Sequence, residues 1–352
     1  MVLGDRLIIK LFRRVEPGPN PDVEIGEQLT SRTPFRRVPR VAAALEYEPS
    51  GEPIGHLFVA HEFVSSQADG WSHALNELAR YYDEAQHAGD PSPDLLPVSR
   101  VSFAAPATPA AMRELAGAYI ESAQLLGRRT GELHGALASD SASPAFAPEA
   151  FTQDDVQRII SNASAELQAV RTTLKPDATE RLERRLAAMR GARGADAVNS
   201  ASARIRIHGD YHLGQVLWAE SDYYILDFEG EPADPLDERR RKESPLKDVA
   251  GMLRSFSYAA YAALFARSDR QGETFSRLEP WARAWIYWSS AAFLRAYASI
   301  AGSAAWLPAD PVQRASLLDL FLIEKALYEL RYELSMRPEW VRIPLRGLED
   351  LL

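Results

Sequence analysis

Three oxygen-bearing side chains stand at a defined spacing in residues 207–232, namely Asp210, Gln215 and Asp227. Asp210 lies five residues before Gln215, and Gln215 lies twelve residues before Asp227. Transfer of a phosphoryl group from a nucleotide needs a carboxylate that orients and deprotonates the acceptor hydroxyl, and it needs oxygen ligands that hold Mg²⁺ against the phosphates. This segment can supply all three oxygen donors.

The same order of residues occurs in the catalytic and metal loops of protein kinases. Here Gln215 replaces the metal-binding asparagine, and Glu229 replaces the glycine of the Asp-Phe-Gly motif. An Asp that precedes an amide by five residues is a weak signal alone, so the prediction depends on matching residues upstream.

Such residues are found near the start of the chain. Lys10 lies in an apolar run, residues 7–12, and is the first lysine of a chain whose next one is Lys175. A kinase uses a strand lysine to hold the α- and β-phosphates and a helix glutamate to pair with that lysine. We expect Glu24 to be this partner, with Glu27 as a substitute on the same helix face. The hinge that offers main-chain groups to adenine is expected around Glu62 and Val64.

The surrounding pattern predicts a small α+β unit over residues 1–65. An apolar strand is expected at 7–12, and Asn20 and Pro21 predict a helix from 21 to about 31. Two further strands, 41–47 and 56–64, are expected to form a hairpin around the turn-rich residues 48–53.

Residues 66–352 are predicted to be mainly helical, with the catalytic loop at 207–217 and the metal loop at 225–232. Helices are expected at 109–138, 152–174, 178–190, 246–266, 280–300 and 310–335. Two β-like runs, 204–208 and 223–227, flank the chemical loop, which therefore lies on a rigid frame.

Composition excludes several classes of protein. The chain has 352 residues, 40 basic and 49 acidic side chains, a formal net charge of −9 and no cysteine. The negative charge disfavours nucleic acid and anionic membranes as partners, and the lack of cysteine excludes disulfides and thiolate chemistry. No segment is typical of an export signal or a transmembrane helix, so we expect a cytoplasmic protein.

The order of strand lysine, helix acid, hinge, helical lobe, catalytic loop and metal loop resembles kinase-like phosphotransferases of the aminoglycoside and sugar kinase type. The resemblance is closest to maltokinases, particularly those fused to trehalose synthase. The segments that carry it are residues 4–29, 207–217, 227–232, 238–255, 327–334, 337–340 and 344–347.

This resemblance implies a bilobal, protein-kinase-like α+β fold that transfers the γ-phosphate of ATP to the anomeric hydroxyl of maltose. The product would be maltose 1-phosphate, for glycogen synthesis linked to trehalose metabolism, with trehalose synthase as a possible partner. It also implies Asp210 as the base, Gln215 and Asp227 as Mg²⁺ ligands, and Lys10 with Glu24 at the ATP phosphates.

Further roles are implied more loosely. Asp248 would hold the backbone of the catalytic loop, and His208 is favoured as a structural residue because Asp210 already fills the role of base. Candidate sugar contacts, in full, are His208, His212, Glu229, Tyr328, Arg331, Tyr332, Glu333 and Trp340.

The first lobe departs from the family pattern, because only nine residues precede Lys10 and the phosphate-covering loop is absent from the sequence. We therefore expect either a piece of a longer protein or a chain that takes its cover from another polypeptide, with weakened turnover. The alternative function is a weakly catalytic or non-catalytic protein that binds nucleotide or sugar as a partner of trehalose synthase. A second alternative reads His208, Asp210 and His212 as ligands of a hydrolytic metal centre, bridged by Asp227.

Overall fold

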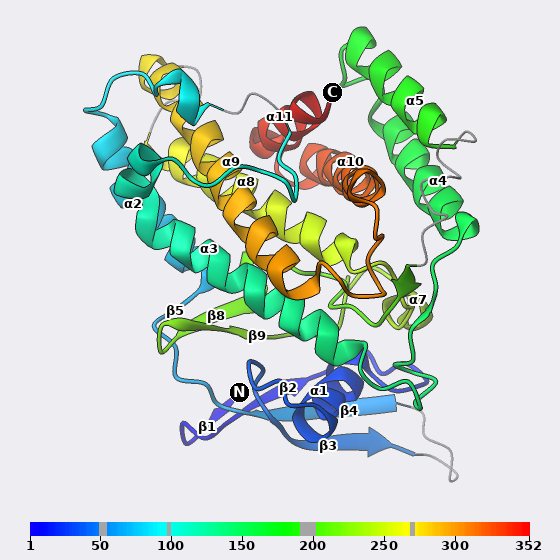
Figure 1. Ribbon diagram of the computed structural model, residues 1–352. Helices are drawn as coiled ribbons and strands as arrows, with labels where there is room; N and C mark the ends of the chain where they lie inside the picture. Colours follow the sequence, from blue (N-terminus) through cyan, green and yellow to red (C-terminus); the bar gives the residue numbers. More distant parts are fainter. Residues whose placement is uncertain (49–54, 97–99, 191–201, 268–271) are drawn as a thin grey trace.

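The computed structural model describes residues 1–48, 55–96, 100–190, 202–267 and 272–352. The expected turn at 48–53 falls almost wholly on residues 49–54, outside the described residues. Figure 1 shows a small N-terminal layer of strands beneath a much larger group of helices.

The small layer is an antiparallel four-stranded sheet with one helix packed against it. In the order β1-β2-β4-β3, its strands are β1 (Val2–Leu3), β2 (Leu7–Leu11), β4 (Gly55–Glu62) and β3 (Val41–Tyr47). Lys10 on β2 pairs in register with Val59 at the centre of β4. The strands at 7–12 and 41–47 are confirmed to within one residue, and that at 56–64 ends two residues early, at Glu62.

Helix α1 (Pro21–Arg32) begins where the sequence predicts it. The Asn20 side chain accepts the backbone N–H of Asp22 at 2.9 Å, and Pro21 takes the first helical position. Gly26 faces the sheet, where an added Cβ would lie 2.6 Å from the side chain of Val41. The lack of a side chain at this position lets α1 pack tightly against β3.

The larger part consists mainly of long helices. Its helices are α2 (Gly70–Ala85), α3 (Ala110–Leu137), α4 (Gln153–Val170), α5 (Pro176–Arg190), α7 (Leu236–Arg239), α8 (Leu246–Arg267), α9 (Glu273–Ala301), α10 (Pro311–Met336) and α11 (Arg342–Leu351). Short strands complete it: β5 (Ala68–Asp69), β6 (Glu149–Ala150), β7 (Ala203–Arg204), β8 (Val216–Ala219) and β9 (Asp222–Ile225). Three-residue 3-10 helices lie at Pro93–Leu95, Leu213–Gln215 and Pro338–Trp340. None of the described helices has the length and apolarity needed to span a membrane.

The expected helix start at residue 280 is wrong, because α9 begins at Glu273 and Pro280 lies inside it. The two turns before this proline bury Phe275 and Leu278, and that burial offsets the hydrogen bond that proline cannot make. The expected strand at 204–208 is also wrong beyond Ile205, which forms a single β-bridge with Glu243. Helices α2, α7 and α11 were not predicted.

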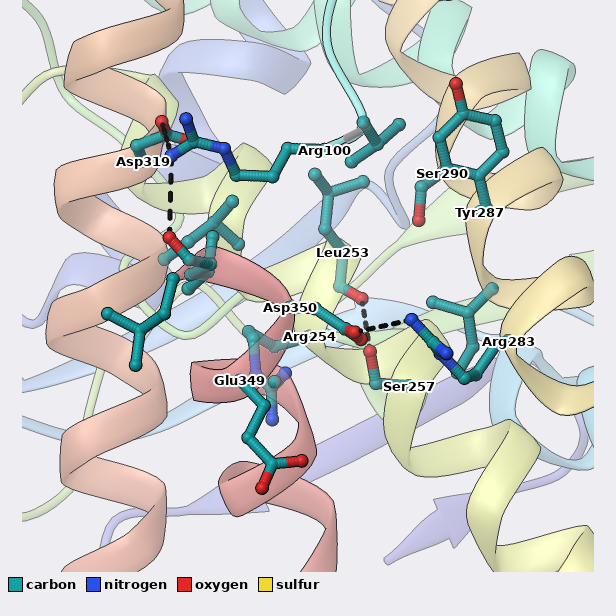
Figure 2. A pocket seen from close by; sticks show the side chains of 16 residues that line it. Arg100, Leu253, Arg254, Ser257, Arg283, Tyr287, Ser290, Asp319, Glu349 and Asp350 are labelled. Atoms are coloured by element: carbon teal, nitrogen blue, oxygen red, sulfur yellow. Dashed lines mark hydrogen bonds and ion pairs between the residues drawn. The ribbon is translucent and has the colours of Figure 1, made fainter. Parts of the chain in front are cut away.

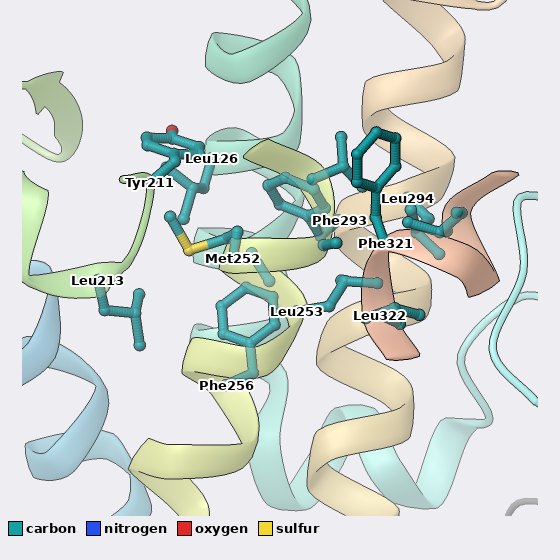
Figure 3. Close-up of a cluster of buried hydrophobic side chains, with 14 of the residues drawn as sticks. Leu126, Tyr211, Leu213, Met252, Leu253, Phe256, Phe293, Leu294, Phe321 and Leu322 are labelled. Carbon is teal, nitrogen blue, oxygen red and sulfur yellow. The ribbon is translucent and has the colours of Figure 1, made fainter. Parts of the chain in front are cut away.

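The core of the larger part lies where α3, α8, α9 and α10 meet (Figure 3). Leu126, Met252, Phe256, Phe293 and Phe321 are almost completely buried there. An added Cβ at Gly127 would lie 2.2 Å from the Phe293 carbonyl, so a glycine lets α3 and α9 approach closely. This packed frame supports the loop that carries Asp210.

The small sheet and the larger part are joined through a second sheet of order β5-β8-β9. The Ile225 N–H on β9 donates to the Arg37 carbonyl at 2.8 Å, and the Arg37 guanidinium pairs with Asp222 at 2.9 Å. Because Asp227 follows β9 directly, these contacts place it opposite Lys10.

Candidate active site

The catalytic loop is held from below by a buried carboxylate. Asp248, in the first turn of α8, is 1% exposed and accepts the backbone N–H groups of His208 at 2.8 Å and Gly209 at 2.9 Å. His134 also contacts it, at 3.1 Å. Burial would raise the pKa of Asp248, but the hydrogen bond and charge of His134, together with the charge and backbone N–H of His208, outweigh burial and lower it. The ionised carboxylate thus fixes the loop backbone immediately before Asp210.

Two glycines allow the loop to take this shape. Gly209 has a φ of +84°, in the left-handed region that favours glycine. Gly251 on α8 lies under the loop, where an added Cβ would be 2.6 Å from the Tyr211 carbonyl.

Asp210 itself is largely buried, with its side chain 19% exposed and 3.7 Å from the His212 ring. Burial would raise the pKa of Asp210, but His212 and the charge of Lys325 lower it below its ordinary value. Asp210 is therefore a carboxylate at neutral pH, the form that accepts a proton.

On the opposite side of the loop, Lys10 lies among three carboxylates. Its Nζ is 3.1 Å from Asp22 and 2.8 Å from Glu229, and it also pairs with Asp227. Burial would lower the pKa of Lys10, but Asp22 and Asp227 raise it well above its ordinary value. The side chain is firmly cationic, as a phosphate anchor requires.

The expected pairing of Lys10 with Glu24 is wrong in this structure. Glu24 pairs with Arg206 at 2.6 Å and with Arg240 at 2.8 Å, and Asp22 takes its place beside Lys10. Residues two apart point to different sides of a helix, so only one of the two acids faces β2. Burial opposes ionisation of Asp22, yet hydrogen bonding by His61 and the charge of Lys10 lower its pKa to about 2.

A cavity of about 470 Å³ opens beside Lys10, between β2, α1 and β9. Asp22, Gln215 and Asp227 line it together with apolar side chains of Ile8, Ile9 and Ile225. It combines an apolar wall with a cation and oxygen donors, the combination that a nucleotide base and its phosphates require.

The donors in this cavity suit Mg²⁺. The carboxylate of Asp227 and the amide of Gln215 are oxygen ligands, and Mg²⁺ is usually held by few protein ligands plus substrate phosphates. Among the described residues there is no group of three or more His, Cys, Asp or Glu that could hold a metal. The hydrolytic centre built on His208, Asp210 and His212 therefore has no support in the described part of the chain.

Glu62 and Val64 are not among the residues that line the 470 Å³ cavity. The Glu62 side chain points to Arg40 at 3.7 Å, and the intervening Phe63 N–H donates to the Arg6 carbonyl. A contact of Glu62 or Val64 with adenine stays a prediction.

Asp210 opens into a second cavity, of about 550 Å³, which we call the acceptor cavity. Four sequence candidates besides His212 line it: Tyr328, Tyr332, Glu333 and Trp340. The lining also contains residues that the sequence did not suggest: Asp69, Trp71, Tyr258, Lys325, Glu329 and Arg337. Two of these missed residues, Lys325 and Glu329, lie on the same face of α10 as Tyr328 and Tyr332, because positions three and four apart share a helix face. Helical spacing from the two tyrosines could therefore have identified them.

Three other candidates lie outside this cavity. Arg331 points away from it and pairs with Glu166 on α4 at 2.6 Å. His208 is 1% exposed and contacts the Leu226 carbonyl at 2.8 Å, and Glu229 is engaged with Lys10 and Asn20. A contact of these three residues with sugar stays a prediction that the lining of the acceptor cavity does not support, whereas the structural role favoured for His208 fits its burial.

The acceptor cavity is acidic. Glu329 is paired with Arg254 at 2.8 Å and Glu333 with Arg337 at 2.6 Å, so their charges are largely balanced. Burial raises the pKa of Glu231, which lines the same cavity near Asp210. Burial and nearby acids, first Glu231, also raise the pKa of Tyr328, to about 12.

Comparisons with known proteins identify a family and several relatives. The family profile described as the phosphotransferase enzyme family matches residues 68–285. The chain is similar to glucosamine kinases of Streptacidiphilus jiangxiensis and of Mycolicibacterium smegmatis (strain ATCC 700084 / mc(2)155), 24% identical to each. Both alignments cover 100% of this chain, and they cover 70% and 76% of the two relatives.

Two solved structures share the fold. A glucosamine kinase in crystal form B gives a TM-score of 0.71 at 24% identity, covering 99% of this chain and 76% of that chain. A glucosamine kinase in complex with glucosamine, ADP and inorganic phosphate gives 0.70 at 23% identity, covering 99% of this chain and 77% of that chain. The kinase-like α+β fold with a mainly helical C-terminal region is thereby confirmed.

Proposed function

The chain belongs to the phosphotransferase enzyme family, and we propose that it transfers the γ-phosphate of ATP to a hydroxyl group of a sugar. One observation carries the proposal. The catalytic loop, residues 207–217, lies between the acceptor cavity and the 470 Å³ cavity. Asp210 lines the acceptor cavity, and Gln215 lines the 470 Å³ cavity together with Lys10 and Asp227. Relatives that the chain matches are named glucosamine kinases.

The roles of the residues follow from their positions. Asp210 accepts the proton of the sugar hydroxyl as its oxygen attacks the γ-phosphorus, and the bond from that phosphorus to the β-phosphate oxygen breaks to release ADP. Lys10 holds the phosphates, while Asp22 orients its amine. Asp248 keeps the loop rigid, so that the hydroxyl is held in line.

Asp227 and Gln215 would hold Mg²⁺, which neutralises charge on the phosphates when it is bound. Both residues line the 470 Å³ cavity, where the Asp227 carboxylate also pairs with Lys10. Their oxygen donors suit this ion better than zinc or copper.

An amino sugar of the glucosamine class is the acceptor we favour. Five carboxylates line the acceptor cavity, against the cations Lys325 and Arg337 in the described lining. Because Glu329 and Glu333 are already paired, Asp69, Asp210 and Glu231 remain against Lys325, and this excess of negative charge would attract an ammonium group.

Maltose, phosphorylated at its anomeric hydroxyl, is the second candidate acceptor. Tyr258 and Trp340 stack at 6.1 Å, and Tyr328 and Tyr332 stack at 6.5 Å along the same cavity. Aromatic faces of this kind pack against sugar rings, and the cavity volume admits more than one ring.

ADP release with glucosamine, glucose and maltose, in the presence of ATP and Mg²⁺, tests the proposal. We expect turnover with glucosamine, and Glu231→Gln should raise the KM for glucosamine about tenfold, the effect of losing one charged contact. Glu121→Gln, an exposed position on α3, is the matched control. Turnover with maltose alone would favour the second candidate, and binding of ATP and sugar without turnover would favour a non-catalytic partner.

A further inference from the structure

A third cavity lies on the side of α8 and α10 that faces away from Asp210. It has a volume of about 510 Å³ and is enclosed by α8, α9, α10, α11 and residues 100–101 (Figure 2). We call it the α8–α11 cavity. Its size is within the range of small-molecule sites, and none of the residues assigned above to phosphoryl transfer lines it.

The charged groups of this cavity are balanced. Three arginines and three acids line it: Arg100, Arg254, Arg283, Asp319, Glu349 and Asp350. Figure 2 shows Arg283 joined to Asp350, and these groups are 2.9 Å apart. Arg100 pairs with Asp319 at 3.0 Å. A cationic ligand would lie close to these arginines, and an anionic ligand would lie close to these carboxylates. The lining therefore favours a neutral molecule.

Several hydrogen-bonding groups of the lining are unused. Within the described ranges, the hydroxyls of Tyr287 and Ser290 have no hydrogen-bond partner, although both residues line the cavity. Neither hydroxyl is among the completely buried side-chain atoms that lack a partner, so each can bond to water or to a ligand in the cavity.

Arg254 is the most buried of the three arginines, with its side chain 5% exposed. Its Nε donates to Glu329 at 2.8 Å, and its Nη2 also lies 2.8 Å from the same carboxylate oxygen. An added Cβ at Gly347 would lie 2.0 Å from Nη1, so α11 has a glycine where this guanidinium reaches the cavity. Arg254 therefore presents to the cavity a guanidinium that Glu329 holds in place.

We propose that the α8–α11 cavity is a second ligand site, separate from the acceptor cavity, for a neutral polyhydroxylated molecule of the class of uncharged mono- and disaccharides. A sugar hydroxyl both donates and accepts hydrogen bonds, so it satisfies arginine, carboxylate and hydroxyl groups alike. The apolar side chains of Leu253, Ile286 and Leu322 supply contact for the ring C–H faces. Because Glu329 lines the acceptor cavity, the Arg254–Glu329 pair forms a shared wall between the two sites.

Amide hydrogen exchange tests this proposal without relying on catalysis. Helix α11 contributes Gly347, Glu349 and Asp350 to the cavity, so its exchange reports on occupancy. Glucose or maltose at ten times its Kd should slow exchange of residues 342–351 about tenfold if opening of α11 releases the sugar. Inorganic phosphate, as a charged probe, should not.

Ser257→Trp places a large side chain in the cavity and should abolish the sugar-dependent protection of α11. Ser161→Trp is the matched control, because Ser161 and Ser257 are both helical serines whose hydroxyls donate to the carbonyl four residues earlier. Ile286→Trp, from α9, blocks the same cavity if Ser257→Trp fails to fold. Absence of protection in the wild type, protection that survives both blocking variants, or protection by phosphate alone would overturn the proposal. Absent ADP release with every sugar would refute only the proposed function.

Discussion

Replacing Asp22 by asparagine tests which acid holds Lys10. The Asp22 side chain is 2% exposed, and its pKa of about 2 lies roughly two units below its ordinary value of 3.8. A tenfold change in an equilibrium constant corresponds to about 1.4 kcal/mol, so the folded state favours the ionised form by roughly 2 to 3 kcal/mol. We expect Asp22→Asn to lower the free energy of unfolding at pH 7 by about 2 kcal/mol.

The pH dependence has a definite sign. Because the folded pKa is depressed, the stabilisation is fully present above about pH 4 and is lost as the pH falls toward 2. The difference in urea midpoint between wild type and Asp22→Asn should therefore shrink below pH 4. A difference that is the same at pH 7 and pH 3 would contradict the assigned pKa.

Enzyme kinetics separate Asp22 from Glu24. Asp22→Asn should raise the KM for ATP about tenfold, the cost of losing roughly 1.4 kcal/mol of orientation at Lys10. Glu24→Gln is the control, because Glu24 pairs with Arg206 and Arg240 and not with Lys10. If Glu24→Gln raised the KM for ATP and Asp22→Asn did not, the reasoning would be refuted.

Three further changes have expected outcomes. Asp248→Asn should lower kcat about 10- to 100-fold in steady-state kinetics, because the carboxylate that holds the loop loses its charge; an unchanged kcat would argue against this role. Gly127→Ala should destabilise the protein by about 1–3 kcal/mol in urea unfolding, because its Cβ would lie 2.2 Å from the backbone carbonyl of Phe293. Gly135→Ala, a helical control with nothing within 4 Å of the added Cβ, should be neutral or stabilising, and equal losses would contradict the clash. Trp340→Ala should raise the KM for the sugar about tenfold and leave that for ATP unchanged, and the reverse result would remove Trp340 from the acceptor cavity.

Sequence spacing predicted the local features of the site. Asn20 and Pro21 give α1 its start, and the apolar run around Lys10 gives β2, because capping and strand periodicity are local properties. The partner of Lys10 was missed, since which face of α1 meets β2 depends on packing between distant segments. The helix start predicted at Pro280 was wrong for the same reason, because tertiary burial of Phe275 and Leu278 outweighs the preference of proline for the first turn of a helix.

The acceptor cavity was only partly predictable. Tyr328 and Tyr332 were proposed because they are aromatic and lie in a segment that carries the family resemblance, but Trp71 and Tyr258 come from helices far away in the sequence. The opposite placement of Arg331 follows from helical periodicity, which turns it toward Glu166 on α4.

The central claim is that Asp210 takes the proton of an acceptor hydroxyl while Lys10, Asp227 and Gln215 hold the nucleotide. ADP release by Asp210→Asn, measured with saturating ATP, Mg²⁺ and sugar, tests it most directly. Loss of a general base predicts a kcat lower by about 10²- to 10⁴-fold with ATP binding retained. Turnover close to that of the wild type would contradict the account.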